Sequence, residues 1–316
     1  GFSGGFFSNY FDPELEHNGV VAPRKGFITD VIADAALAFI ERERTHPFFC
    51  YVPFNACHSP MQAPADLFAK YSQRGFAPME AAVYAMVENL DHNTGRLLAK
   101  LDELGLAANT IVIFATDNGP NSRRFNGGMR GGKGSVFEGG MRVPLIIAGK
   151  PVKKAGELSA AFAWATDITP TILALSGVAQ PSDRYAGRPV LPMTGRDLTA
   201  ILRGEADHIY TKDDAVGYEL TGHGALFQGD YKIVVNQPPL GDGQWRLFNI
   251  VEDPGETVDL ASTLPIIFQR MLSRYQRFEH ENGVLPLPAG YSQVKQLVSN
   301  TLQAQYREGL LIFLLS

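Results

Sequence analysis

Two short segments of the sequence carry side chains that suit chemistry on an anion. Asp117 and Asn118 offer a carboxylate and an amide oxygen, hard donors that suit Ca²⁺ or Mg²⁺ better than zinc. His58 lies in a loop between Pro53 and Pro60, and a titratable imidazole there could be a general acid or an anion donor. The two segments are candidates for a metal site and for a proton donor.

A third segment, residues 126–144, is rich in glycine and positively charged. Seven glycines within fourteen positions leave backbone amides free to approach an anion, so we expect an oxyanion site. Its cationic side chains are Arg130, Lys133 and Arg142. Residues 127–133 fit the phosphate-loop pattern G-x-x-x-x-G-K, but Gly134 stands where Ser or Thr must bind the metal. No predicted strand directly precedes the segment either, so we reject a nucleotide site.

Each segment also has an ordinary structural interpretation. Asp-Asn-Gly is a common turn composition, a single loop histidine is usually a surface residue, and a glycine-rich stretch can be a flexible loop. These alternatives stay open from the residues alone. The position of His58 and Asp117 shortly after predicted strands favours a site, because ligands of open α/β sheets bind beyond the carboxyl ends of the strands.

The elements expected around these segments indicate an α/β domain. Apolar residues at helical spacing predict helices over 30–43, 78–104 and 170–176, whereas residues 1–25 lack a period and are expected to be an extended loop. Short apolar runs predict buried strands of a largely parallel sheet at 48–52, 111–115 and 143–148. Three strands are too few for a complete sheet of this kind.

Short strands in close succession follow after about residue 205. They are predicted at 215–218, 225–227, 231–235 and 245–249. The turn at 228–230 indicates an antiparallel hairpin, and a helix is expected over 266–279. We therefore expect an α/β domain over 1–205, a smaller α+β subdomain over 206–290 and a helical tail over 291–316.

Composition excludes several classes of protein. The 316 residues are 45% hydrophobic and 19% charged, which is ordinary for a globular chain. The net charge is −5 and the basic residues are scattered, so we expect no nucleic-acid partner. No apolar run approaches the roughly 18 to 20 residues of a membrane-spanning helix, and we expect no membrane span. Cys50 and Cys57 form no zinc or redox motif.

Taken in order, the motifs of the chain resemble those of bacterial arylsulfatases, which are type I sulfatases of the alkaline phosphatase superfamily. The order of the motifs is more specific than any one of them, and the likeness covers roughly residues 26–260. The matching motifs are Pro47-Phe-Phe-Cys-Tyr-Val with Asn55-Ala-Cys-His-Ser-Pro, Thr110-Ile-Val-Ile-Phe-Ala-Thr-Asp-Asn-Gly, Met129-Arg-Gly-Gly-Lys-Gly-Ser-Val-Phe-Glu-Gly-Gly-Met-Arg-Val-Pro, Asp167-Ile-Thr-Pro-Thr-Ile-Leu, and Trp245-Arg-Leu-Phe-Asn-Ile with Asp253-Pro-Gly-Glu.

The resemblance implies an alkaline-phosphatase-like fold whose site holds one Ca²⁺, with Mg²⁺ as an alternative ion. Asp117 and Asn118 would supply two of the metal ligands. Lys133 would bind the sulfate oxygens, with Arg130 as a further substrate-binding candidate, and His58 would contact the sulfate near the leaving oxygen and could protonate it. These roles suit sulfate-ester hydrolysis, which places charge on the equatorial and leaving oxygens.

One part of the family pattern is missing from the sequence. The family's nucleophile is a Cys or Ser in C/S-x-P-x-R that is oxidised to formylglycine, and neither Cys50 nor Cys57 has this context. Two further aspartates of the calcium site are missing too. We expect both features outside this chain, which alone should be inactive, whereas the complete protein should hydrolyse a small-molecule or glycan sulfate ester. The family's usual location would make it periplasmic or secreted.

Two alternative functions remain. A phosphomonoester, phosphodiester or phosphonate hydrolase of the same superfamily would use a similar anion cradle. A non-catalytic sulfatase-like binding protein would keep the fold without the chemistry. The sequence upstream of this chain would distinguish them. The motifs determine neither which sulfate ester is used nor the oligomeric state.

Overall fold

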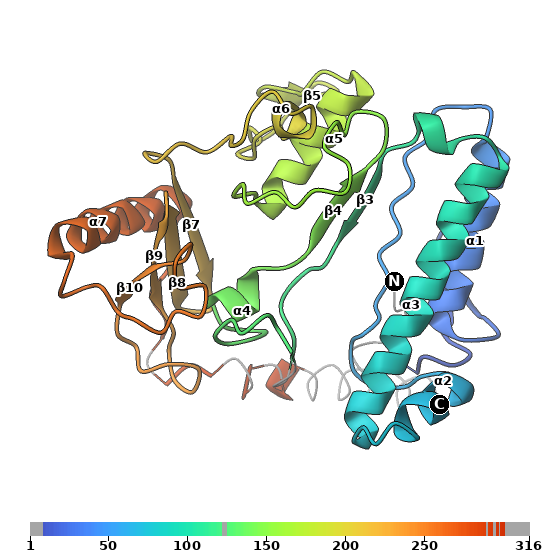
Figure 1. Cartoon of the computed structure of the whole chain (residues 1–316), viewed down its shortest axis with the longest axis horizontal. Helices are drawn as coiled ribbons and strands as arrows, with labels where there is room; N and C mark the ends of the chain where they lie inside the picture. The colour runs from blue at the N-terminus through green and yellow to red at the C-terminus, as the bar shows by residue number, and fades with distance from the viewer. Residues whose placement is uncertain (1–8, 122–124, 289, 293–294, 297, 301–316) are drawn as a thin grey trace, which may run out of the picture. The chain divides into compact units, whose positions relative to one another are not determined.

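The structure, a computed structural model, describes residues 9–121, 125–288, 290–292, 295–296 and 298–300. The chain forms two compact units (Figure 1). One comprises the described residues up to Val112 with Ala148–Lys150, and the other comprises Ile113–Ile147 with the described residues from Pro151 onward. Within these described ranges, no helix is long and apolar enough to cross a membrane.

The first unit is built around three helices, α1 (Ile28–Glu43), α2 (Ala65–Ser72) and α3 (Pro78–Glu103), followed by a short 3₁₀ turn at Ala107–Asn109. Asp30 of α1 accepts hydrogen bonds from the side-chain amides of Asn89 and Asn93 in α3, at 2.9 and 2.7 Å, which ties the two helices together. The helix α3 starts with a proline, whose fixed φ suits the first turn. Gly105 follows the helix in the left-handed conformation, with φ 69°. The predicted helices over 30–43 and 78–104 are confirmed.

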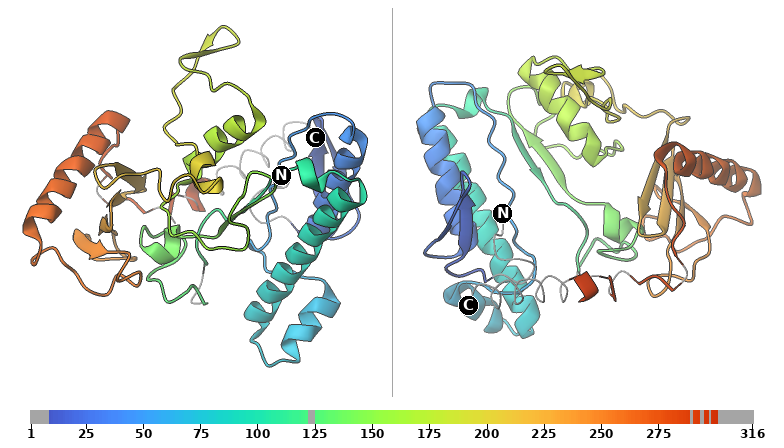
Figure 2. Two further views of the ribbon diagram at one scale, coloured as in Figure 1. Left: turned by 45° about the horizontal axis from the view of Figure 1, so that its top comes forward. Right: turned by 180° about the vertical axis from the view of Figure 1, so that it is seen from behind.

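Two sequence predictions for the first unit are wrong. The opening residues contain an antiparallel hairpin, β1 (Glu14–His17) and β2 (Val20–Pro23), and not only an extended loop (Figure 2). Its turn is Asn18-Gly19, with φ of 52° and 83°, the sequence and geometry that favour a tight hairpin.

Residues 48–52 form no strand, although a buried strand was predicted there. A strand needs a neighbour for its backbone hydrogen bonds, and the exposure of Phe49 (68%) and Tyr51 (76%) indicates that this run is not covered on both faces.

The other two predicted strands, at 111–115 and 143–148, lie side by side although they are separate in the sequence. Strands β3 (Val112–Ala115) and β4 (Leu145–Ala148) pair in a two-stranded sheet, which confirms that both strands exist. Their predicted burial is wrong, since no residue of either strand is buried and Ile146 is 58% exposed. The Thr116 N–H donates to the Pro144 carbonyl at 3.4 Å, so the end of β3 lies beside the start of β4. The remaining short elements before residue 205 are α4 (Glu138–Met141), a 3₁₀ turn (Ala165–Asp167), α5 (Ile168–Ser176), the pair β5 (Arg184–Tyr185) and β6 (Arg188–Pro189), and α6 (Thr199–Leu202).

A four-stranded antiparallel sheet forms the C-terminal part of the second unit, as predicted. Its order is β10-β9-β8-β7, from strands β7 (Ala215–Leu220), β8 (His223–Gln228), β9 (Tyr231–Val235) and β10 (Arg246–Asn249). The predicted hairpin at 228–230 joins β8 to β9. Helix α7 (Pro265–Asn282) packs on one face through Met271 and Tyr275. The other face packs on Val136 and Phe137, which lie within the glycine-rich segment. Successive strand residues point to opposite faces, so β8, β9 and β10 each contribute side chains to both cores.

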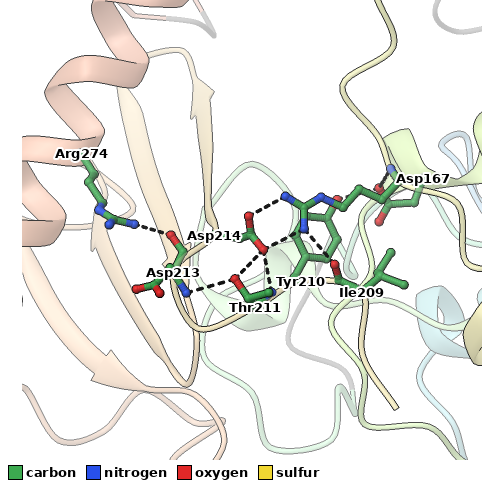
Figure 3. Close-up of polar contacts among 8 residues, drawn as sticks. Asp167, Ile209, Tyr210, Thr211, Asp213, Asp214 and Arg274 are labelled. Carbon is green, nitrogen blue, oxygen red and sulfur yellow. Dashed lines mark hydrogen bonds and ion pairs between the residues drawn. The ribbon is translucent and has the colours of Figure 1, made fainter. Parts of the chain in front are cut away.

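A polar network fixes the segment that leads into this sheet (Figure 3). The guanidinium of Arg196 donates to both carboxylate oxygens of Asp214, at 2.7 and 2.5 Å. These hydrogen bonds hold the pKa of Asp214 well below its usual range. The fully buried Asp167 accepts from the Arg196 N–H at 2.8 Å and from the Tyr210 hydroxyl at 2.7 Å. The start of β7 is therefore attached to the 3₁₀ turn that precedes α5.

The predicted domain limits near residues 205 and 290 remain a prediction. Most of the predicted helical tail, residues 291–316, lies outside the described residues. Its described residues 295–296 and 298–300 are helical. The combination of helices, a β3–β4 pair and an antiparallel C-terminal sheet agrees with the predicted mixed fold.

Candidate anion-binding site

The turn after β3 presents two oxygen donors. Asp117 is exposed, and its Oδ1 accepts the Asn118 N–H at 2.9 Å. The side-chain nitrogen of Asn118 donates to the Gly119 carbonyl at 2.9 Å, which directs the amide oxygen of Asn118 away from that carbonyl. A carboxylate and an amide oxygen thus follow each other at the end of a strand, and both are donors that a hard divalent cation prefers.

The glycine-rich segment is hydrogen-bonded to this turn. The Lys133 N–H donates to the Pro120 carbonyl at 2.9 Å, and the Gly119 N–H donates to the Gly140 carbonyl at 2.9 Å. A Cβ atom on Gly119 would lie 1.8 Å from the carbonyl oxygen of Gly139, so only glycine permits this approach. The fold therefore brings Asp117 and Asn118 close to Lys133 along the backbone, although the two segments are separate in sequence.

Internal contacts give the glycine-rich segment a defined conformation. Gly131 and Gly134 adopt φ of 77° and 87°, which other residues rarely take. The Gly139 N–H donates to the Arg130 carbonyl at 2.7 Å, and the Ser135 hydroxyl donates to the Gly132 carbonyl at 2.8 Å. These bonds show an ordered segment rather than a flexible surface loop, and its binding of an anion remains a prediction.

The two predicted cations of this segment differ in their surroundings. The Arg130 guanidinium lies over the Phe137 ring, 4.2 Å from its centroid, and donates to the Glu256 carbonyl at 3.2 Å. Lys133 has an exposed side chain. Arg130 thus has a structural role that the sequence did not suggest, and its binding of substrate remains a prediction, as does that of Lys133.

His58 belongs to the first unit, in a loop that a buried tyrosine holds. Its Nδ1 lies 2.9 Å from the Ser59 carbonyl, which can only accept, so Nδ1 carries the proton and a neutral ring has Nε2 unprotonated. The Tyr10 hydroxyl approaches the carbonyls of Asn55 and His58 at 2.9 and 2.8 Å. Tyr10 is fully buried, and burial raises its pKa, so it stays a hydrogen-bond donor at neutral pH.

The predicted site residues are therefore divided between the two units. Asp117, Asn118, Arg130 and Lys133 lie in the second unit and His58 in the first. Their convergence on one anion stays a prediction. Within the described residues, no group of three or more His, Cys, Asp and Glu side chains could hold a metal ion.

Sequence reasoning missed several residues that support the candidate site. Tyr10 lies in the opening residues, where nothing in the local pattern distinguished it. Lys232, Glu138 and Glu256 form a buried ionic cluster beside the glycine-rich segment. One signal was present for Lys232: it takes an inward position of β9, two residues before the buried Val234. Glu256 ends the motif Asp253-Pro-Gly-Glu, to which no role had been assigned.

Comparisons with known proteins agree with the order of the motifs. The sulfatase family model matches residues 4–178. Human N-acetylgalactosamine-6-sulfatase is 37% identical over 287 residues, which cover 82% of this chain and 53% of that protein. A sulfatase of Schizosaccharomyces pombe, named as uncharacterized, is 27% identical over 335 residues, which cover 78% of this chain and 60% of that protein.

A solved structure is similar as well. The crystal structure of Ps i-CgsB in complex with k-i-k-neocarrahexaose superposes with a TM-score of 0.73 at 27% identity and covers 92% of this chain and 62% of that one. This chain thus spans between about half and two thirds of the length of the three proteins. The family model matches more than half of the chain, and the structural similarity extends over nearly all of it. The chain therefore belongs to the sulfatase family, as a type I sulfatase of the alkaline phosphatase superfamily.

Proposed function

We propose that the complete protein hydrolyses sulfate esters. The observation that carries the proposal is the contact between the turn after β3 and the glycine-rich segment, where the Lys133 N–H donates to the Pro120 carbonyl at 2.9 Å. Two oxygen donors and an ammonium group then come from adjacent backbone segments. An ester sulfate is an anion, and a cation together with an ammonium group would stabilise the charge on its oxygens as the S–O bond breaks.

His58 is the proposed proton donor to the leaving oxygen. Its Nδ1–H faces the Ser59 carbonyl at 2.9 Å, so the second proton of a charged ring is held at Nε2. Donation from Nε2 would neutralise the oxygen that leaves with the organic group. This role requires His58 to reach the anion that Lys133 binds, and that convergence is part of the proposal.

Asp117 and Asn118 are proposed to contribute two ligands to a Ca²⁺ ion, with Mg²⁺ as the alternative. Their donor set fits, because one carboxylate and one amide oxygen are hard ligands and the Asn118 amide nitrogen is turned to the Gly119 carbonyl. Calcium takes six to eight oxygens, so the remaining ligands must come from elsewhere. When bound, the cation would offset the negative charge of the sulfate. The formylglycine nucleophile is likewise expected in a segment outside this sequence.

The proposed substrate is a small-molecule or glycan sulfate ester. Relatives named as N-acetylgalactosamine-6-sulfatase and steryl-sulfatase, and a similar structure in complex with neocarrahexaose, span both kinds of organic group. A periplasmic or secreted location is proposed from the family alone. The phosphate and phosphonate alternatives are not favoured, since the family model and the named relatives are sulfatases.

The test is hydrolysis of a chromogenic aryl sulfate by the full-length protein that contains this chain, beside the matching aryl phosphate. We expect sulfate release, and we expect Lys133→Met to lower kcat by about 100- to 1,000-fold, the usual cost of removing one preorganised charge-stabilising donor. A calcium chelator should lower activity, and added Ca²⁺ should restore it. A formylglycine-bearing protein that cleaves the phosphate but not the sulfate would refute the proposal.

A further inference from the structure

A buried ionic cluster joins the glycine-rich segment, through its Glu138, to Lys232 and Glu256. The Lys232 ammonium is 3.0 Å from a carboxylate oxygen of Glu138 and 3.0 Å from one of Glu256. The side chains of Lys232 and Glu256 are fully buried, and that of Glu138 is 4% exposed. Burial raises the pKa of Glu256, and the Lys232 ammonium opposes that effect. Charges so deeply buried are maintained only when they are paired and hydrogen-bonded.

The cluster also contacts the glycine-rich segment on both sides of Lys133, through a backbone N–H at Glu138 and through the side chain of Arg130. The second carboxylate oxygen of Glu256 accepts the Glu138 N–H at 2.7 Å, and the backbone carbonyl of Glu256 accepts from the Arg130 guanidinium at 3.2 Å. Glu256 thus contacts Arg130 and Glu138, which lie before and after Lys133 in the sequence. In addition, Oδ1 of the buried Asn236 accepts the Val136 N–H at 3.0 Å. We name Lys232, Asn236 and Glu256 the loop clamp.

Fold stability alone is a poor explanation for the clamp. A buried ion pair or triad is often no more stabilising than well-packed apolar residues of similar volume. Glu256 also adopts a φ of 51°, a conformation that is unfavourable for a non-glycine residue and is maintained by its surroundings. Directional hydrogen bonds to a particular backbone amide, by contrast, determine where a segment lies, which an apolar contact does less precisely.

We infer that the loop clamp consists of positioning residues, which hold the backbone of residues 130–138 so that Lys133 meets the sulfate. This inference rests on the proposed function. The clamp residues act through the segment and touch no substrate themselves. The C-terminal sheet, which supplies Lys232 and Asn236 from β9 and the residue after it, thereby becomes part of the catalytic apparatus.

The main experiment compares Glu256→Gln with wild type in the full-length protein. An amide is neutral and has one oxygen where the carboxylate has two, so it can still accept the Glu138 N–H but no longer forms an ion pair with Lys232. A shift of about 1 Å in a positioned group can cost about 100-fold in rate, so we expect kcat/KM for an aryl sulfate to fall by about 10- to 100-fold. Amide hydrogen exchange within residues 131–140 should become faster than in the rest of the second unit.

Asp214→Asn is the matched control, because it removes a hydrogen-bonded carboxylate of the same unit that contacts Arg196 and Thr211 and not the glycine-rich segment. It should keep wild-type kcat/KM and wild-type exchange in residues 131–140. Asn236→Ala is the second clamp variant, which tests the inference if Glu256→Gln does not fold. It removes one neutral acceptor, so amide exchange at Val136 should become faster.

The outcomes separate the inference from the proposed function. A folded clamp variant with wild-type kcat/KM and unchanged exchange overturns the inference, and so does an equal loss in Asp214→Asn. If the wild-type protein releases no sulfate, the proposed function fails, whereas the exchange measurement still decides whether the clamp holds the segment.

Discussion

Replacing Tyr10 by phenylalanine isolates the contact that holds the His58 loop. The change removes one hydroxyl and keeps the ring, which is fully buried beside Phe27. That hydroxyl lies 2.9 Å from the Asn55 carbonyl and 2.8 Å from the His58 carbonyl. Without it the His58 carbonyl loses this donor, whereas the Asn55 carbonyl still accepts the His58 N–H at 2.9 Å.

The expected cost follows from this geometry. Leaving a buried acceptor unpaired costs about 1 to 3 kcal/mol, and each kcal/mol lowers the Tm of a domain of this size by roughly 2 to 4 °C. We therefore expect Tm to fall by about 2 to 12 °C. Because the His58 carbonyl belongs to the proposed proton donor, its displacement should also lower kcat for an aryl sulfate by about 10-fold or more at a temperature where the variant is folded.

Tyr210→Phe is the control for the tyrosine experiment. It also removes a tyrosine hydroxyl, one that donates to Asp167 at 2.7 Å within the second unit (Figure 3). Thermal unfolding and kcat should be measured for both variants. We expect both to lose stability and only Tyr10→Phe to lose kcat. Equal kcat values for the two variants and wild type would refute the role of Tyr10 in positioning His58.

Two further predictions concern the pH dependence of stability. Hydrogen bonds from Arg196 and Thr211 depress the pKa of Asp214, so its contribution is present above the unfolded value of about 3.9 and lost as the pH falls below it. Asp214→Asn should lower the free energy of unfolding by about 1 kcal/mol at pH 7 and by much less at pH 3, in urea titrations. Burial depresses the pKa of His223, whose Nδ1 accepts the Gln237 N–H at 2.9 Å. The free energy of unfolding should therefore decrease as the pH falls below the unfolded value of about 6.5, and His223→Gln should weaken that decrease between pH 7.5 and 5.5.

Periodic elements were the ones that the sequence could predict. The apolar stripe over 78–104 and the short β-branched run over 231–235 give a helix and a strand close to those limits. Both patterns are local, because the helical period and the run of apolar residues are contained within the element. The hairpin at Asn18-Gly19 was also predictable in principle, since this dipeptide favours a tight turn, but the short strands beside it alternate weakly.

The strand expected over 48–52 failed for a different reason. A continuous apolar run shows only that a segment can be buried, whereas a strand exists through hydrogen bonds to a neighbouring strand. The residues of the run do not reveal whether a second strand lies beside it. The large exposure of Phe49 and Tyr51 is what an apolar run shows when its faces are not covered.

The contacts that hold the candidate site residues could not be predicted from the sequence. Motif order predicts His58, Asp117, Asn118 and Lys133 as site residues, and their roles stay a prediction. The bond between Glu256 and the Glu138 N–H, however, joins residues 118 positions apart, and the Tyr10 hydroxyl bonds to residues 45 and 48 positions away. Such pairings follow from the tertiary fold, and no local period contains them.

The charges of the glycine-rich segment indicate which of its residues can serve an anion. Arg130 lies on the Phe137 ring and on the Glu256 carbonyl, and Arg142 lies 3.8 Å from a carboxylate oxygen of Glu138. Among the ion pairs of the described residues, none includes Lys133. Two cations of the segment are thus used to hold it in place. The third is exposed next to the turn that carries Asp117, and an incoming sulfate could be bound there without breaking an ion pair on which the segment depends.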